Sequence, residues 1–196
     1  GDLRSKSSMY IITEKDAETG ALFSRNRYNS IFYEQVCFFT VDSTKMSFTC
    51  DRTEFIGRNG SLQSPAAMSR VKLSGKNGAS MDACAAIQIP IGLYTGEEKE
   101  IIFRLGAGNN EHEARNSSET TNDQEFANEA LKKVHDFWNE TLGIVHVKTP
   151  DAALNFLANG WLVYQALACR VWGRSGYYQS GGAFGFRDQL QDVMAL

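Results

Sequence analysis

The spacing of apolar residues changes along this chain of 196 residues, and that change limits the fold more than any other feature. Up to about residue 108, short runs of β-branched and aromatic residues alternate with turn-forming residues, which is typical of strands. From about residue 123, apolar residues recur at intervals of three and four, which is typical of helices. Because strands followed by helices separate into different layers or domains, the sequence predicts a multi-domain α+β chain.

Five runs in the first part have the composition of strands, and they cover residues 8–13, 35–41, 45–50, 85–91 and 100–105. Gly, Asn and Asp residues cluster between these runs, for example at 58–60 and 75–78, where hairpin connections are expected. Short strands separated in this way favour an antiparallel β-sandwich, which we expect to span residues 1–108.

A polar stretch poor in core-forming residues follows, and we interpret residues 109–148 as a linker that contains one amphipathic helix. This helix is predicted over 123–142, because its apolar residues form a single stripe and Gly143 follows it. Thr149, Pro150 and Asp151 then form a helix start with Pro in the first turn. Residues 149–196 are therefore predicted to open a helical domain.

The helix expected from Asp151 to about Trp172 is apolar around much of its circumference, so it needs neighbours on several sides. A second helix is expected from about Asp188, and it reaches Leu196 without a capping Gly or Pro. We therefore expect this chain to be an internal fragment of a longer protein, with further helices encoded after Leu196.

The charge of the chain argues against nucleic acid as a partner. The net charge is −3, the pI is near 5.7, and no basic run is long. No stretch approaches the roughly 20 apolar residues of a membrane span, and the first residues do not resemble a signal peptide. We expect no membrane contact from this segment.

The four cysteines stand singly in apolar runs, without a CxxC pair or a histidine at ligand spacing. We therefore expect no metal site, and free thiols in a reducing, cytoplasmic setting. A disulfide between Cys37 and Cys50 stays an alternative if their strands are adjacent.

Residues 174–196 hold the strongest candidate site. Glycines there permit a ligand to approach the backbone closely, and aromatic rings offer flat apolar faces. These residues are Gly176, Gly181, Gly182, Gly185, Tyr177, Tyr178, Phe184 and Phe186. Arg187 and Asp188 add a charged donor and a charged acceptor that can divide the vicinal hydroxyls of a sugar ring between them. In the alternative interpretation, Asp188 and Gln191 form a capping box that starts an ordinary helix; both roles can hold together.

Three segments together resemble glycoside hydrolase family 94, the inverting sugar phosphorylases. They are Thr49–Gly60 with Pro65, Trp161–Gln165 with Cys169 and Arg170, and Gly173–Asp192. The third segment is long, and it looks most like the branch of β-1,2-oligoglucan phosphorylases and the C-terminal modules of cyclic β-1,2-glucan synthases. The resemblance implies an N-terminal β-sandwich, a helical linker and the first helices of an incomplete (α/α)6 barrel.

The same resemblance assigns substrate-binding residues. Arg187 and Asp188 match the pair that holds the glycosyl ring beside the broken bond, and Tyr178, Gln179 and Gln189 are placed with them. The general acid of the family is an Asp in a later barrel segment, so no catalytic residue is expected before Leu196.

One departure from the family bears on linkage. Cellobiose phosphorylases carry a further sugar-contacting Arg where this chain has Gly182, which favours a different linkage preference. The reaction implied by the resemblance is phosphorolysis of a β-1,2-linked glucan with inversion, which releases α-glucose 1-phosphate. Inorganic phosphate is then a co-substrate, no other cofactor is expected, and the parent protein is expected to be a homodimer.

Four residues outside that segment have two interpretations. Arg52, Glu54 and Arg58 lie close to a predicted turn, where charged side chains are usually solvated or internally paired, although the resemblance makes them candidates for an interdomain or substrate contact. Gln165 is the one strongly polar residue of a short apolar run and is a further candidate. Two other functions stay open: a noncatalytic carbohydrate-binding sandwich with a docking helical tail, and an inverting glycoside hydrolase on the same barrel.

Overall fold

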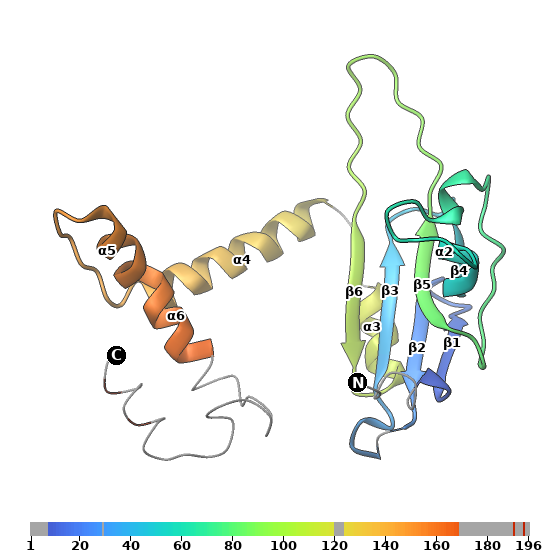
Figure 1. Ribbon diagram of the computed structural model, residues 1–196, viewed down its shortest axis with the longest axis horizontal. Coiled ribbons are helices and arrows are strands. Elements are labelled where there is room, and N and C mark those ends of the chain that lie inside the picture. The colour runs from blue at the N-terminus through green and yellow to red at the C-terminus, as the bar shows by residue number, and fades with distance from the viewer. Residues whose placement is uncertain (1–7, 29, 120–123, 169–189, 191–193, 195–196) are drawn as a thin grey trace. The chain divides into compact units, whose positions relative to one another are not determined.

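The computed structural model of the chain describes residues 8–28, 30–119, 124–168, 190 and 194 (Figure 1). The chain divides into two compact units, Gly1–Ala127 and Asn128–Leu196, and each is described by itself. Within the described residues, every strand lies in the first unit, and helices follow in the second. The predicted α+β class, with a sheet-rich N-terminal part followed by helices, is confirmed.

A four-stranded antiparallel sheet forms the larger layer of the first unit. In spatial order its strands are β1 (Ile11–Lys15), β2 (Leu22–Asn26), β3 (Val36–Val41) and β6 (Phe103–Gly108). Asp16 closes the β1–β2 turn, because its carboxylate accepts hydrogen bonds from the backbone N–H and the hydroxyl of Thr19. Gly20 completes that turn at a φ of 73°, a conformation that favours glycine. The connection to β3 contains the short turn η1 (Ser30–Phe32).

Helix α3 (Glu111–Glu119) packs on one face of this sheet, against β3 and β6. Two glycines of β6 leave room here, Gly106 for the Phe38 ring of the neighbouring strand and Gly108 for the backbone of α3. A Cβ on Gly106 would lie 2.5 Å from the Phe38 ring, and a Cβ on Gly108 would lie 2.4 Å from the backbone nitrogen of Ala114. The buried core between helix and sheet consists of Ala21, Phe23, Val36, Phe38 and Ala114.

The position of α3 corrects one prediction. The sequence predicts a linker with one helix over residues 109–148, whereas the structure has α3 at Glu111–Glu119 before α4, and α3 belongs to the first unit. Most of its residues are polar and face solvent, and only Ala114 and Ser118 are buried. A helix that buries two small side chains has no apolar stripe for the sequence pattern to reveal.

An ion-pair network ties the β1–β2 hairpin to α3. Arg115 of α3 contacts Asp16 at 2.7 Å and Glu111 at 3.0 Å, while Arg25 of β2 contacts Glu14 at 2.6 Å and Glu111 at 2.9 Å. The Asp16 side chain is only 6% exposed, so its charge needs a partner. The hydrogen bonds from Arg115 lower the pKa of Asp16 to about 2, although burial acts in the opposite direction.

A smaller sheet consists of two antiparallel strands, β4 (Ser47–Asp51) and β5 (Ala83–Gln88). Two contacts join this part of the unit to β1. Thr13 pairs through its backbone with Gly78, in the loop before β5, and the Nζ of Lys15 lies 5.6 Å from the centre of the Phe48 ring on β4. Helix α2 (Arg52–Ile56) follows β4, and the turn η2 (Ala66–Ser69) follows α2. A second core cluster lies here, formed by Phe55, Ala67, Leu73, Cys84 and Ala86.

Cys37, Cys50 and Cys84 are free thiols. Cys37 lies on β3 and Cys50 on β4, which belong to different sheets, so the alternative disulfide between them does not form. Burial raises the pKa of the Cys50 thiol and raises that of Cys84 to about 11, with a smaller contribution from neighbouring charges to the latter. Both are therefore protonated, poorly nucleophilic side chains of the interior.

The helical part of the chain begins with α4 (Gln124–Leu142), which agrees with the helix predicted over 123–142. The helix start at Asp151 is also confirmed, since its carboxylate accepts hydrogen bonds from the N–H groups of Ala153 and Leu154. The continuous helix expected after it is wrong. A short α5 (Ala152–Phe156) and α6 (Leu162–Ala166) are separated by a kinked turn, η3 (Leu157–Trp161).

We expect Asp16→Asn to lower the free energy of unfolding by about 2 kcal/mol at neutral pH, because the depressed pKa measures how much the fold favours the charged carboxylate. Because the folded pKa lies below the unfolded one, this contribution is complete above about pH 4 and is lost as the pH falls toward 2. Urea denaturation at several pH values measures it.

The deficit of the Asp16→Asn variant should therefore shrink as the solution is acidified. Glu18→Gln is the matched control, because Glu18 also contacts Arg115, at 3.2 Å, but its side chain is 67% exposed. The control should change stability little, since exposed ion pairs contribute little. A deficit for Asp16→Asn that stays constant across this pH range contradicts the assignment.

Candidate functional site

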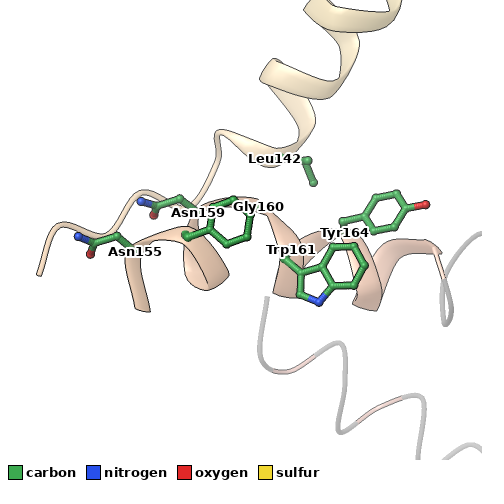
Figure 2. A pocket seen from close by; sticks show the side chains of 7 residues that line it. Leu142, Asn155, Asn159, Gly160, Trp161 and Tyr164 are labelled. Atoms are coloured by element: carbon green, nitrogen blue, oxygen red, sulfur yellow. The ribbon is translucent and has the colours of Figure 1, made fainter. Parts of the chain in front are cut away.

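A cleft of about 600 Å³ lies in the second unit, beside the kink between α5 and α6 (Figure 2). It is lined by Leu142, Asn155, Phe156, Asn159, Gly160, Trp161 and Tyr164. Figure 2 shows the rings of Trp161 and Tyr164 near one another along α6, while the amide groups of Asn155 and Asn159 point away from them. The cleft therefore has an aromatic part and a polar rim.

Asn159 causes the helix to break where it does. Its side-chain oxygen accepts a hydrogen bond from the backbone N–H of Val147 at 2.6 Å, and its side-chain nitrogen donates to the carbonyl of Val147 at 2.8 Å. The amide thus satisfies both backbone groups of one residue, as a neighbouring strand would. Asn159 and Gly160 leave helical dihedral angles at this point, and α6 begins at Leu162.

Asn155 repeats this arrangement one helical turn earlier. Its oxygen accepts from the backbone N–H of Thr149 at 2.7 Å and from the Thr149 hydroxyl at 2.8 Å, and its nitrogen donates to the Thr149 carbonyl at 2.8 Å. Alternate residues of the extended segment before α5 are therefore held by asparagines spaced four apart. We call Asn155 and Asn159, with the two residues that they hold, the asparagine clamp.

The aromatic part of the cleft consists of rings in direct contact. The Trp161 and Tyr164 rings are stacked, with centroids 5.8 Å apart and planes 25° apart, and the Tyr164 centroid lies 5.3 Å from that of Trp138 on α4. Trp161 is 51% exposed in this unit. Flat, partly exposed rings of this kind bind the apolar face of a sugar ring or pack against another helix.

The described lining of the cleft offers aromatic rings and amide groups, which are binding groups. Among the described residues that line it, none is a carboxylate or a histidine. Among the described residues, no group of three or more His, Cys, Asp and Glu side chains is placed to hold a metal ion. Within the same residues, no helix combines the length and the apolar composition needed to cross a bilayer.

The five predicted sugar-contacting residues, Tyr178, Gln179, Arg187, Asp188 and Gln189, lie outside the residues that the structure describes. Their roles therefore stay predictions. Gln165 lies on α6 with its side chain exposed, one residue after Tyr164 of the cleft. Gln165 is not among the described residues that line the cleft, and its role stays a prediction.

The predicted residues of the first unit lie around α2. Arg52 contacts Asp82 at 3.2 Å, and Arg58 is exposed in the turn that follows α2. Glu54 is buried, and its carboxylate accepts hydrogen bonds from the Thr49 hydroxyl and from both the backbone and the hydroxyl of Ser74.

Burial raises the pKa of Glu54, but the hydrogen bonds from Ser74 and Thr49 and the charge of Arg70 outweigh it, so the pKa is lowered overall. Arg70 lies 3.5 Å from this carboxylate. In this unit the Glu54 carboxylate therefore binds the loop between α2 and β5. A contact with substrate or with another domain stays a prediction for Arg52, Glu54 and Arg58.

The asparagine clamp was not predicted. The available signal was a pair of asparagines four residues apart, at 155 and 159, within an otherwise apolar helical run. Asn is a poor helix former because its amide competes for backbone hydrogen bonds. Two such residues on one face of an apolar run indicate bonding to a segment outside the helix.

Comparison with known proteins assigns the family. Residues 2–124 match the supersandwich domain of glycosyl hydrolase 94, and residues 137–196 match the catalytic domain of the glycosyl hydrolase 94 superfamily. The chain belongs to glycosyl hydrolase family 94, and the resemblance predicted from its sequence segments is confirmed.

The curated relatives are longer proteins. The cyclic β-(1,2)-glucan synthase NdvB of Rhizobium meliloti is 38% identical over 100% of this chain and 7% of its own length. An N,N'-diacetylchitobiose phosphorylase of Vibrio proteolyticus is 27% identical over 86% of the chain and 21% of the relative, and a solabiose phosphorylase of Paenibacillus borealis is 25% identical over 98% of the chain and 24% of the relative. The chain therefore spans less than a quarter of each of these relatives.

We expect Asn159→Leu to destabilise the second unit by about 1–3 kcal/mol, because the N–H and carbonyl of Val147 lose their shared partner without gaining another. The variant should also speed hydrogen exchange at the Val147 amide. Asn155→Leu is the matched variant, and it should expose the Thr149 amide instead. Equal exchange at Val147 in wild type and Asn159→Leu contradicts the clamp.

Proposed function

We propose that this chain is part of a glycoside phosphorylase, or of the phosphorylase-like module of a glucan synthase, that acts on β-1,2-linked glucans. One observation carries the choice of linkage. The identity of 38% with a cyclic β-(1,2)-glucan synthase extends over the whole chain, whereas the relatives named for chitobiose and solabiose are 27% and 25% identical. The sequence segment 173–192 supports the same branch.

In the proposed reaction, inorganic phosphate attacks the anomeric carbon of the terminal glucosyl unit from the face opposite the leaving sugar. The bond from that carbon to the bridging oxygen breaks, a bond to a phosphate oxygen forms, and an Asp from a later barrel segment gives its proton to the departing oxygen. The anomeric configuration inverts, so the product is α-glucose 1-phosphate and a glucan shorter by one unit. Phosphate takes the place of the water and general base of an inverting hydrolase.

The residues of this chain bind and orient the sugar in this proposal. Arg187 donates to, and Asp188 accepts from, hydroxyls of the glucosyl ring, with Tyr178, Gln179 and Gln189 beside them. Charge-assisted hydrogen bonds fix the ring relative to the attacking phosphate. Holding the two reactants in this orientation lowers the barrier to their reaction. The chain on its own, residues 1–196, is expected to release no glucose 1-phosphate.

We also propose that the whole protein is a cytoplasmic homodimer. Free thiols at Cys37, Cys50 and Cys84 support a reducing compartment. Phosphorolysis also suits a compartment that contains inorganic phosphate and can use a phosphorylated sugar.

The longer protein tests the proposal directly. It is incubated with β-1,2-oligoglucan and phosphate, with cellobiose and chitobiose as competing substrates, and the anomeric configuration of the sugar phosphate is read by NMR. Formation of α-glucose 1-phosphate from the β-1,2-linked substrate supports the proposal. Release of free glucose without phosphate consumption identifies a hydrolase instead, and binding without turnover identifies a carbohydrate-binding module.

In the longer protein, we expect Asp188→Asn to lower kcat/KM by about tenfold to a few hundredfold, because the carboxylate loses one acceptor and its charge in the transition state. Stability should change little, since Asn caps helices about as well as Asp. Asp151→Asn is the matched control, because Asp151 has a described capping role at α5. If Asp188→Asn behaves like Asp151→Asn in turnover, Asp188 is only a cap.

A further inference from the structure

Three asparagines of this chain are followed directly by glycine. They are Asn59 before Gly60, Asn77 before Gly78 and Asn159 before Gly160. Because glycine has no side chain, its backbone nitrogen can reach the side-chain carbon of the preceding asparagine and close a succinimide ring. All three pairs are therefore chemically labile in an unfolded chain, and the folded structure decides which of them reacts.

The reaction needs only base and water. The backbone nitrogen of glycine loses its proton and bonds to the side-chain carbonyl carbon of asparagine, while the amide nitrogen of that side chain leaves as ammonia. Water then opens the ring at one of its two carbonyls, which gives aspartate or isoaspartate. A hydrogen bond that holds the glycine N–H or the asparagine amide opposes the first step, because it must break before the ring can close.

The pair at Asn77 is held by β1. The N–H of Gly78 donates to the hydroxyl of Thr13 at 3.1 Å, and the carbonyl of Gly78 accepts from the Thr13 N–H at 2.9 Å. Thr13 is only 3% exposed, and the Asn77 side chain itself donates to the carbonyl of Gly75 at 3.1 Å. Ring closure at Asn77 therefore requires the contact between the two sheets to open.

The pair at Asn159 is held by the asparagine clamp. Both ends of the Asn159 amide bind the backbone of Val147, at 2.6 Å through the oxygen and 2.8 Å through the nitrogen. Figure 2 shows this side chain at the kink, beside Gly160. Its carbonyl carbon cannot turn toward the Gly160 nitrogen until both hydrogen bonds break.

The turn after α2 gives Asn59 no comparable protection. Among the described residues, none forms a hydrogen bond with the Asn59 side chain, and the Gly60 N–H donates only to the carbonyl of Gly57, at 3.2 Å within the same turn. Opening this bond disturbs no strand. The turn also requires glycine, because a Cβ on Gly60 would lie 2.0 Å from the carbonyl oxygen of Ile56.

We propose that Asn59 is a site of spontaneous deamidation in this chain, and that Asn77 and Asn159 are protected by the hydrogen bonds that hold them. The product places a new negative charge beside Arg58, and isoaspartate also adds a methylene to the backbone of a tight turn. The modification therefore changes the charge and the geometry at one of the residues predicted to contact substrate or another domain. The inference does not depend on the proposed reaction.

Isotope labelling during ageing measures the reaction at each asparagine. The full chain is kept at mildly alkaline pH in heavy-oxygen water, and its peptides are analysed by mass spectrometry, since ring opening leaves one heavy oxygen in the new carboxylate. We expect Asn59 to react about tenfold faster than Asn77 and Asn159, and the three rates to converge in denaturant. Equal rates in the folded chain, or a faster reaction at Asn77 or Asn159, overturn the proposal.

Thr13→Val tests the protection itself, because it removes the hydroxyl that binds the Gly78 N–H and keeps the shape of the side chain. The rate at Asn77 should rise by about tenfold while the rate at Asn59 in the same sample stays unchanged. A general loss of stability would also release Asn159, so the ratio of the rates separates the two effects. An unchanged ratio of Asn77 to Asn59 contradicts the protection by β1.

Two matched variants locate the charge change without digestion. Asn59→Gln and Asn77→Gln each keep an amide, but the longer side chain closes a ring less readily. On ion exchange, acidic forms of the aged chain should nearly disappear in Asn59→Gln and accumulate as in wild type in Asn77→Gln. If Asn59→Gln accumulates acidic forms as fast as wild type, Asn59 is not the site.

Discussion

The pairing of Asp16 with Arg115 is the interaction on which the first unit depends most. It joins the turn of the β1–β2 hairpin to α3, two segments separated by most of the unit in sequence, at a distance of 2.7 Å. The carboxylate also closes its own turn through Thr19, so the same side chain shapes the hairpin and holds the helix that covers the core. Loss of its charge therefore loosens local and long-range structure together.

Elsewhere, polar side chains also hold irregular segments in place, because they form the hydrogen bonds that a neighbouring backbone would otherwise form. Glu54 accepts hydrogen bonds from the backbone and the hydroxyl of Ser74, and Asn159 satisfies both backbone groups of Val147. Irregular segments cannot pair with themselves, and an unsatisfied buried backbone group is costly. These few side chains therefore decide where the loop after α2 and the segment before α5 lie.

The sequence predicted those elements whose apolar residues form a regular pattern. Strands β3 and β4 and helix α4 coincide closely with predicted runs, whereas β6 begins three residues later than the run predicted over 100–105. Strand β2 was missed because only Leu22 and Phe23 are apolar, after which Ser24, Arg25 and Asn26 resemble a loop. The run predicted over 85–91 ends at Gln88, because Pro90 has no N–H to give to a sheet.

The site was predictable to a different extent in its two parts. The charged pair Arg187 and Asp188 stands out in the sequence, because donor and acceptor groups suited to sugar hydroxyls adjoin a glycine-rich aromatic segment. Trp161 and Tyr164 of the cleft belong to a helix that the sequence predicts to be apolar around much of its circumference, and the asparagine clamp was not predicted. The clamp is hard to recognise in the sequence because its hydrogen-bond partners are the backbone groups of Val147 and Thr149. These groups come close to the asparagines only when the chain folds back.

The clamp also explains why two poor helix formers stand in this apolar helix. Asn159 lies in the kinked turn between α5 and α6, where it and Gly160 leave helical dihedral angles, and α6 starts at Leu162. The asparagines act on the segment that precedes α5, through the backbone groups of Val147 and Thr149. The helix propensity lost at Asn155 and Asn159 is therefore offset by the hydrogen bonds that hold the segment before α5.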